Sequence, residues 1–126
     1  MTGVQTCALP IYGNSTHSNA ELTVEAIKAL YDNEGEVEDI DLLACGTTSP
    51  DQLLPSHTSM VHGLLMNNPV EILSPSGSCC TGMHAMRYAY LSILSGQRQH
   101  AVCTGSEKFS SWMLAKNFRK IGRAHV

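Results

Sequence analysis

The sequence predicts an α/β fold in which a small parallel sheet carries helices on its faces. Short apolar segments at residues 41–47, 70–74 and 101–105 alternate with helical patterns at residues 57–66 and 80–94. Strands that alternate with helices in this way are typical of βαβ units, whose strands lie parallel. Three strands form only a thin sheet, so we expect an incomplete sheet that is a fragment of a larger domain.

The first element is expected to be a helix over residues 19–31, with Ser18 or Asn19 as its cap and Glu21 in its first turn. Apolar residues recur there at spacings of three and four, which indicates one buried face: Leu22, Ala26, Ala29 and Leu30, with Val24 and Ile27 alongside. Residues 32–41 then carry six acidic side chains. We interpret this run as a solvated turn rather than a partner-binding loop.

The central strands are short and apolar. Residues 41–47, DLLACGT, end at a glycine, as expected of a buried strand. A loop at residues 49–55 leads to the helix at 57–66, which Asn67-Asn68-Pro69 should close. The second strand is expected at residues 70–74.

The longest helix is expected over residues 80–94, and Gly96 is the residue predicted to end it. The third strand, AVCTG, follows at residues 101–105, and a further helix is expected at residues 110–118.

Composition and charge argue against several classes of protein. The formal net charge is −3, which supports neither nucleic-acid binding nor a basic membrane surface. No apolar run reaches the roughly 18–20 residues of a membrane span, and the N-terminus lacks the positive segment of a signal peptide. The five cysteines lack disulfide-type spacing and are expected to be reduced thiols, so we expect a cytoplasmic protein.

The two ends of the chain read differently from its middle. Residues 2–11, TGVQTCALPI, and residues 121–126, IGRAHV, stand at these ends. Both segments can be written in codons that share one stretch of DNA. The reverse complement of the codons for residues 8–11 is the start of the codons for residues 121–126, with one extra base upstream. Both strings resemble translated short-read sequencing adapter. We therefore expect residues 1–11 and 121–126 to be artefacts and residues 12–120 to be the natural segment.

A thiol stands at the joint between the second strand and the long helix. The turn at residues 75–78 reverses the chain, and the helix begins near Cys80. The first N–H groups of a helix lack partners and lie at the positive end of its dipole, which favours a thiolate and could hold an oxyanion. Open α/β sheets bind ligands beyond the carboxyl ends of their strands, where this joint lies. Cys80 is therefore the candidate nucleophile, with an inert packing role as the alternative.

The other thiols have simpler explanations. Cys45 and Cys103 lie in apolar strand patterns and Cys79 precedes the helix, so all three are expected to be packed in the core. Cys80 and His84 have an i, i+4 spacing that could suit a metal, but no further ligands at zinc-like spacing accompany them, so no metal is expected. His84 lies one turn into this helix and could interact with the thiol of Cys80, but a packing role is the expectation for it.

Five short motifs occur in order along the middle of the chain. They are Thr47-Thr48-Ser49 at a strand end, Pro55-Ser56 before a helix, Cys80-Thr81-Gly82 opening the long helix, Ser95-Gly96 at its end, and Gly105-Ser106-Glu107 after the next strand. This order resembles the β-ketoacyl-[acyl-carrier-protein] synthase III family of the thiolase superfamily, over residues 40–108. The resemblance implies the N-terminal half of a layered α/β/α thiolase-like fold, and it assigns the nucleophile to Cys80, not Cys79.

The resemblance also implies a decarboxylative Claisen condensation. An acyl group passes from a thioester to Cys80, and the carbanion formed from a malonyl thioester then attacks the acyl-enzyme. The backbone N–H of Cys80 would contribute to the oxyanion hole. Family members draw a His and an Asn from the other half of the fold, so the chain as written is expected to be catalytically incomplete. His57 and His62 match neither residue and are expected to be surface or packing residues.

The expected substrates are thioesters of coenzyme A or of an acyl carrier protein, and no cofactor is expected. The full-length enzyme is expected to be a homodimer in fatty-acid, polyketide or aryl-polyene biosynthesis, and a degradative thiolase would keep the fold with different chemistry. Two alternatives remain: a non-catalytic half-fold that pairs with a partner subunit, and a truncated read without independent function.

Overall fold

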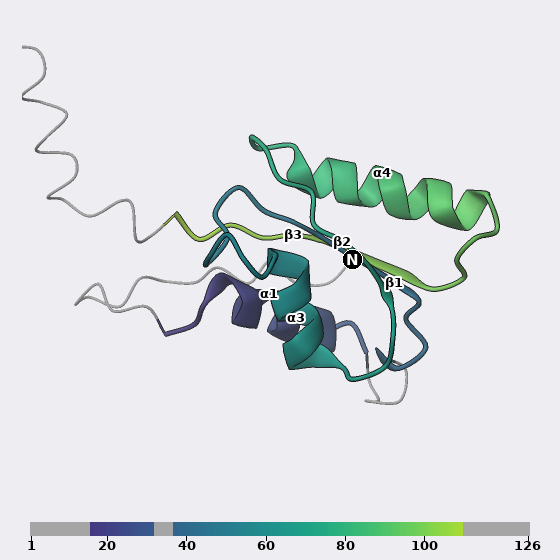
Figure 1. Cartoon of the computed structure of the whole chain (residues 1–126), viewed down its shortest axis with the longest axis horizontal. Coiled ribbons are helices and arrows are strands. Elements are labelled where there is room, and N and C mark those ends of the chain that lie inside the picture. Colours follow the sequence, from purple (N-terminus) through teal and green to yellow (C-terminus); the bar gives the residue numbers. More distant parts are fainter. Residues whose placement is uncertain (1–15, 32–36, 110–126) are drawn as a thin grey trace, which may run out of the picture.

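The computed structural model describes residues 16–31 and 37–109 (Figure 1). Its elements are α1 (Asn19–Lys28), β1 (Leu42–Gly46), α3 (His57–Leu65), β2 (Glu71–Leu73), α4 (Thr81–Leu94) and β3 (Ala101–Gly105). The strands form a parallel sheet in the order β2-β1-β3, which confirms the predicted α/β class. The predicted helix at 110–118, both terminal segments and the first half of the acidic run, residues 32–36, lie outside the described residues.

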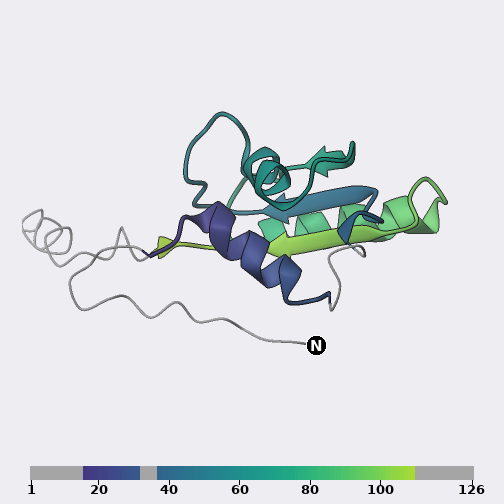
Figure 2. The ribbon, with the colours of Figure 1, turned by 90° about the horizontal axis from the view of Figure 1, so that it is seen from below.

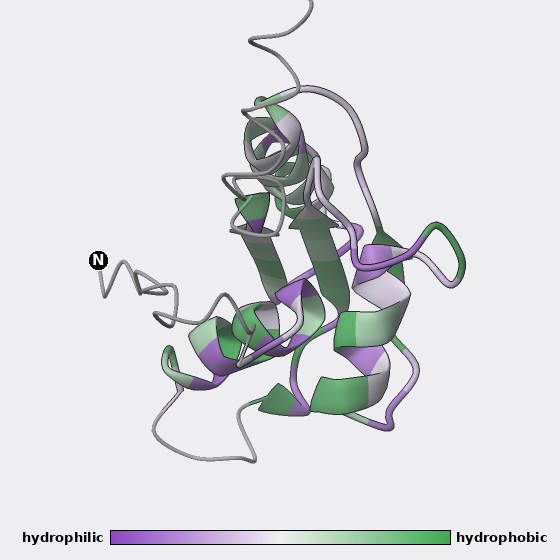
Figure 3. Ribbon diagram, turned by 90° about the vertical axis from the view of Figure 1, so that its left-hand side faces the viewer, coloured by the Kyte–Doolittle hydropathy of each residue, from purple (hydrophilic) through white to green (hydrophobic). Residues whose placement is uncertain are grey.

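The sheet lies between two layers of helices. In Figures 1 and 2, α4 lies on one face, and α1 and α3 lie on the other. Every residue of β1 is buried because this strand is central and covered on both sides. Successive strand residues point to opposite faces, so Leu43 and Cys45 join Val24, Ile27 and Val61 in the core beneath α1 and α3. The strands are accordingly coloured as hydrophobic in Figure 3.

The helix ends follow the signals in the sequence. Of the two expected caps, Ser18 and Asn19, Ser18 caps α1, and it also forms a capping box with Glu21. The predicted helix end at Tyr31 was wrong by three residues, because the last turn closes with i, i+3 bonds such as Leu30 N–H to the Ile27 carbonyl at 3.0 Å. Gly96 ends α4 with a φ of +75°, a conformation that favours glycine.

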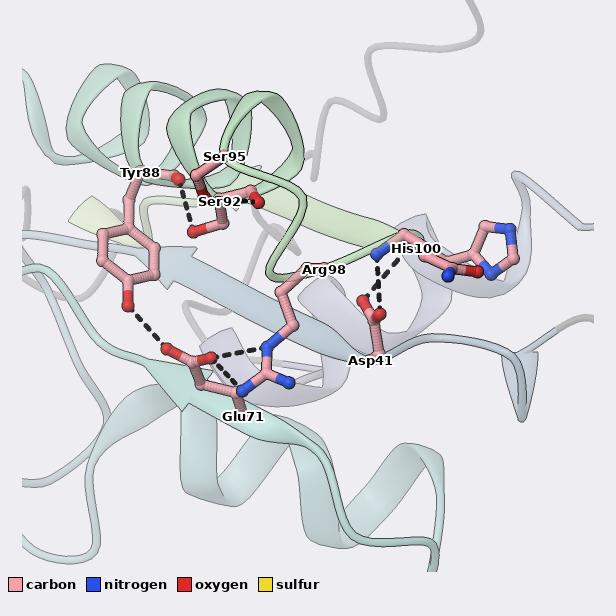
Figure 4. A network of polar contacts seen from close by, with 8 residues as sticks. Asp41, Glu71, Tyr88, Ser92, Ser95, Arg98 and His100 are labelled. Carbon is pink, nitrogen blue, oxygen red and sulfur yellow. Dashed lines mark hydrogen bonds and ion pairs between the residues drawn. The ribbon is translucent and has the colours of Figure 1, made fainter.

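A polar cluster fastens the amino ends of the strands (Figure 4). Glu71 on β2 accepts hydrogen bonds from the Tyr88 hydroxyl at 2.5 Å and from Arg98 Nε at 2.6 Å. These hydrogen bonds lower the pKa of Glu71. Asp41 accepts a hydrogen bond from the backbone N–H of His100 at 3.1 Å. The C-terminal end of α4 and the connection to β3 are therefore held at the amino ends of the strands. The candidate site lies at the opposite, carboxyl ends of the strands.

One side of α4 has no cover within the described residues. Its buried residues are small or short: Thr81, Ala85, Ala89 and Ser92. Its exposed residues include large apolar side chains: Met83, Met86, Tyr90 and Leu94. A helix that is apolar all round is typical of the interior of a larger protein. Among the helices of residues 16–31 and 37–109, none is long and apolar enough to cross a membrane.

Candidate functional site

Cys80 lies at the carboxyl edge of the sheet, at the start of α4. The turn after β2 forms a parallel bridge between Ser76 and Thr47, and this bridge continues the strand pairing beyond β1. Cys80 is the N-cap residue, and its side chain makes no capping hydrogen bond. Its carbonyl accepts the first helical hydrogen bond, from His84 N–H at 3.0 Å. The predicted position of Cys80 at the joint is thus confirmed, and its side chain is exposed.

Three glycines allow the first turn of α4 to approach the ends of β1 and β3. A Cβ atom built on Gly46 would clash with the carbonyl group of Thr81. A Cβ atom on Gly82 would lie 3.2 Å from the Cα of Gly105, and the converse also holds. A side chain at Gly46 would therefore force the backbone to shift, whereas at Gly82 or Gly105 the facing backbone would have to give way by a few tenths of an ångström. The position of Cys80 is therefore fixed by backbone contact between the helix and the sheet.

The surroundings of the Cys80 thiol differ from the sequence-based expectation in two respects. His84 does not pack in the core. It is exposed, and its Nε2 lies 3.8 Å from Cys80 Sγ. The backbone N–H of Cys80 donates to the Ser78 carbonyl, so in this structure it does not point freely toward an oxyanion. The N–H groups of the first turn of α4, which lack intrahelical acceptors, are the remaining donors at this end.

The four cysteines of the described residues fall into two groups. Cys45 is buried in β1, as predicted, and burial raises its pKa to about 11. Cys79 and Cys103 are exposed, so the prediction that they are packed in the core was wrong. Cys79 lies on the turn before α4, and Cys103 lies on the outer strand β3, where no further strand covers it in this part of the chain. Among the exposed cysteines of the described residues, Cys80 is the one at the N-cap of a helix.

A carboxylate holds together the turns that follow β1 and β3. Glu107 accepts hydrogen bonds from the backbone N–H of Thr48 at 2.7 Å and from Ser49 Oγ at 2.8 Å, and the Thr48 hydroxyl also contacts it. Desolvation would raise the pKa of Glu107, but the bonds from Thr48 and Ser49 outweigh it and lower that pKa. The Thr47-Thr48-Ser49 and Gly105-Ser106-Glu107 motifs thus contact each other directly.

His57 lies in a buried polar cluster behind these turns. Its Nε2 is 3.2 Å from Ser106 Oγ and 3.3 Å from Thr23 Oγ1, whereas its Nδ1 has no hydrogen-bond partner among the described residues. Burial lowers the pKa of His57, against the opposing influence of Asp51 and Glu107. The packing role expected for His57 is confirmed.

Asn19 joins the same cluster from α1. It is fully buried, and its Nδ2 donates to Thr47 Oγ1 at 2.9 Å. The sequence patterns predicted no role for Asn19 beyond capping the first helix. An asparagine at the start of a buried helix face is unusual and indicates a buried hydrogen bond. Its partner, Thr47, could not be identified from the sequence because it lies 28 residues away.

Metal ligands are not grouped in the part of the chain that the structure describes. Across residues 16–31 and 37–109, no three His, Cys, Asp or Glu side chains are arranged to hold a metal ion. His62 instead contacts the backbone carbonyl of Asn68 through Nε2 at 2.9 Å.

Solved structures of the thiolase-like class have this fold. The chain is similar to a β-ketoacyl-[acyl-carrier-protein] synthase III from Thermus thermophilus, with a TM-score of 0.70 and 20% identity over 85% of this chain and 33% of the other. It is also similar to 3-oxoacyl-[acyl-carrier-protein] synthase III from Aquifex aeolicus, with a TM-score of 0.54 and 28% identity over 59% of this chain and 24% of the other.

Proteins similar to this chain in sequence have the same name as the Thermus thermophilus structural neighbour. The chain is 29% identical to β-ketoacyl-[acyl-carrier-protein] synthase III of Rickettsia prowazekii over 101 residues, which are 80% of this chain and 32% of the relative. It is 32% identical to the Neisseria gonorrhoeae enzyme of the same name over 93 residues, or 72% of this chain and 29% of the relative. No protein-family model matches the sequence. The chain is thus a relative of β-ketoacyl-[acyl-carrier-protein] synthase III, as the motifs predicted, and it spans about a third of the length of these relatives.

Proposed function

We propose that this chain carries the nucleophile of a condensing enzyme, and that Cys80 accepts an acyl group from an acyl thioester. The observation that supports this most is the exposed thiol at the start of α4, at the carboxyl edge of a parallel sheet. Attack of the thiol on the donor carbonyl forms a new thioester on Cys80 and releases the donor's own thiol. The donor is a thioester of coenzyme A or of an acyl carrier protein.

The second half of the proposed reaction requires groups that we place outside this sequence. A malonyl thioester loses CO₂, and the resulting carbanion attacks the carbonyl of acyl-Cys80 to give a β-ketoacyl thioester and the Cys80 thiolate, which then takes up a proton from solvent. We propose that the groups promoting decarboxylation belong to the remaining two thirds found in the relatives, and that the whole enzyme is a cytoplasmic homodimer of fatty-acid or polyketide-type synthesis. The chain alone should therefore be acylated without completing the condensation.

The test is acylation of the 126-residue chain by acetyl-coenzyme A, followed by intact mass measurement and peptide mapping. We expect one acetyl group on Cys80, and none in Cys80→Ala. Cys103→Ala is the matched control because it removes another exposed thiol, and it should be acylated like the wild type. Cys79→Ala is a second control, which removes the thiol next to Cys80 and should also be acylated like the wild type. Equal acetylation of Cys80 and Cys103 would contradict the proposal.

A second candidate function is a half-fold that acts only when it pairs with a separate subunit. The exposed apolar side of α4, with Met83, Tyr90 and Leu94 more than half exposed at 61%, 63% and 67%, favours it. Co-expression with the C-terminal two thirds of the Neisseria relative distinguishes the two. Recovery of β-ketoacyl product from acetyl-Cys80 and a malonyl thioester supports a condensing half, whereas a stable complex with no product supports the pairing module.

A further inference from the structure

The thiol of Cys80 has an imidazole as its neighbour on the same helix. Cys80 and His84 lie four residues apart, so they share one side of the first turn of α4. Cys80 Sγ and His84 Nε2 are 3.8 Å apart, which is within hydrogen-bond reach for sulfur. Both side chains are exposed, and within residues 16–31 and 37–109 neither is hydrogen bonded to a third side chain. A reacting carbonyl could therefore approach the pair from solvent.

The helix itself maintains this arrangement. The His84 N–H donates to the Cys80 carbonyl at 3.0 Å, so the two residues are linked by the first hydrogen bond of α4. The start of α4 is in turn fixed against the sheet through Gly46 and Gly82. The pair consequently depends only on this part of the chain and needs no group from another half of the fold.

We propose that His84 is the general base for the transfer of the acyl group to Cys80. A nucleophile and a base within hydrogen-bond reach are the arrangement that activates a thiol. This inference rests on the proposed function, because it concerns the acylation half of the same reaction. It adds a second histidine to the chemistry, distinct from the histidine that promotes decarboxylation in the other half of the family fold.

The step balances as follows. His84 Nε2 takes the proton of the Cys80 thiol, and the thiolate forms a C–S bond to the carbonyl carbon of the acyl thioester. The tetrahedral intermediate collapses with cleavage of the C–S bond to the donor. The leaving thiolate then takes the proton from the imidazolium, so His84 returns to its neutral form and the donor leaves as a free thiol. No oxidant, reductant or metal takes part.

The test compares His84→Ala with the wild type in acetyl transfer from acetyl-coenzyme A to Cys80. We expect the rate in His84→Ala to fall about 100-fold, at the lower end of what a positioned general base contributes. Added imidazole should restore much of that rate, because a small base can occupy the space left by the side chain. His100→Ala is the matched control, since His100 is an exposed histidine at the opposite edge of the sheet, and imidazole should not change its rate.

Circular dichroism and thermal melting should show the same fold in both variants, because the His84 side chain is exposed. Acylation of His84→Ala at the wild-type rate would overturn the inference while the proposed function stands. If the wild type is not acetylated at Cys80, the proposed function fails. The rate of Cys80 alkylation by iodoacetamide then decides the inference, which is overturned if His84→Ala leaves that rate unchanged and supported if the rate falls and imidazole restores it.

Discussion

Cys45 and Cys80 lie next to the same contact in the fold but have different surroundings. Cys45 precedes Gly46 and Cys80 precedes Thr81, and Gly46 packs against the backbone of Thr81. Cys45 is fully buried in β1, where burial raises its pKa to about 11. Cys80 is exposed at the start of α4. The carboxyl end of β1 thus separates a buried thiol, Cys45, from an exposed thiol, Cys80, that a substrate can reach.

The hydrogen bonds around the two thiols show the same division. Thr58 Oγ1 donates to the Cys45 carbonyl at 3.2 Å, and the Cys45 N–H donates back to Thr58 Oγ1 at 3.3 Å, so α3 covers this part of β1. Cys80 Sγ instead lies 3.8 Å from Nε2 of the exposed His84 ring. Reactivity is therefore expected to differ between the two cysteines although both are free thiols.

The largest expected effect is on alkylation near neutral pH. Iodoacetamide should modify Cys80 rapidly and Cys45 at least about a thousandfold more slowly, because Cys45 reacts only after the fold opens. Peptide mapping over time measures both rates in one sample. In denaturant the two rates should converge, which is the internal control. Similar rates in the native protein would mean that β1 is not the protected core strand.

The contact that joins the two regions can be broken by Gly46→Ala. The added Cβ would clash with the Thr81 carbonyl, so we expect a loss of about 1–3 kcal/mol in the free energy of unfolding together with slower acylation of Cys80. Gly63→Ala is the matched control, because a Cβ at Gly63 meets nothing within 4 Å. It should be neutral or stabilising by up to about 1 kcal/mol in a helix. Equal effects of the two changes would contradict the close approach of α4 to β1.

A smaller effect is expected for Glu107→Gln, which weakens the junction between the turns after β1 and β3. The loss should be about 1 kcal/mol at neutral pH, since the hydrogen bonds from Thr48 and Ser49 are solvent-accessible in part. The pKa of Glu107 lies below its usual value of 4.5. Such a carboxylate stabilises the fold above that value, and this stability is lost as pH falls through the folded pKa.

Urea unfolding at several pH values measures this contribution. The wild type should lose stability on acidification below the usual carboxyl pKa, and Glu107→Gln should lose less. Glu38→Gln, a change at an exposed carboxylate, should leave the pH dependence as in the wild type. A wild-type pH dependence in Glu107→Gln would show that this carboxylate does not hold the turns.

Local sequence patterns were sufficient to predict the helices and strands and the position of Cys80 between a strand and a helix. Apolar runs identified the three strands, with the bounds of β3 as predicted, and the Gly96 signal identified the end of α4. These are local properties, because periodicity, caps and turn residues act within a few positions of the chain. Cys80 followed from the same local pattern, since a strand, a turn and a helix meet there.

The side chains that surround Cys80 and the adjacent turns depend instead on how the helices pack on the sheet. Cys79 and Cys103 match the core pattern but are exposed, because exposure depends on what other elements cover them. The contact between Glu107 and Thr48 joins residues 59 positions apart, and the cluster of Asn19 and His57 likewise depends on how α1 and α3 pack on the sheet. Such contacts arise from chain segments that are distant in sequence, and no local pattern specifies them.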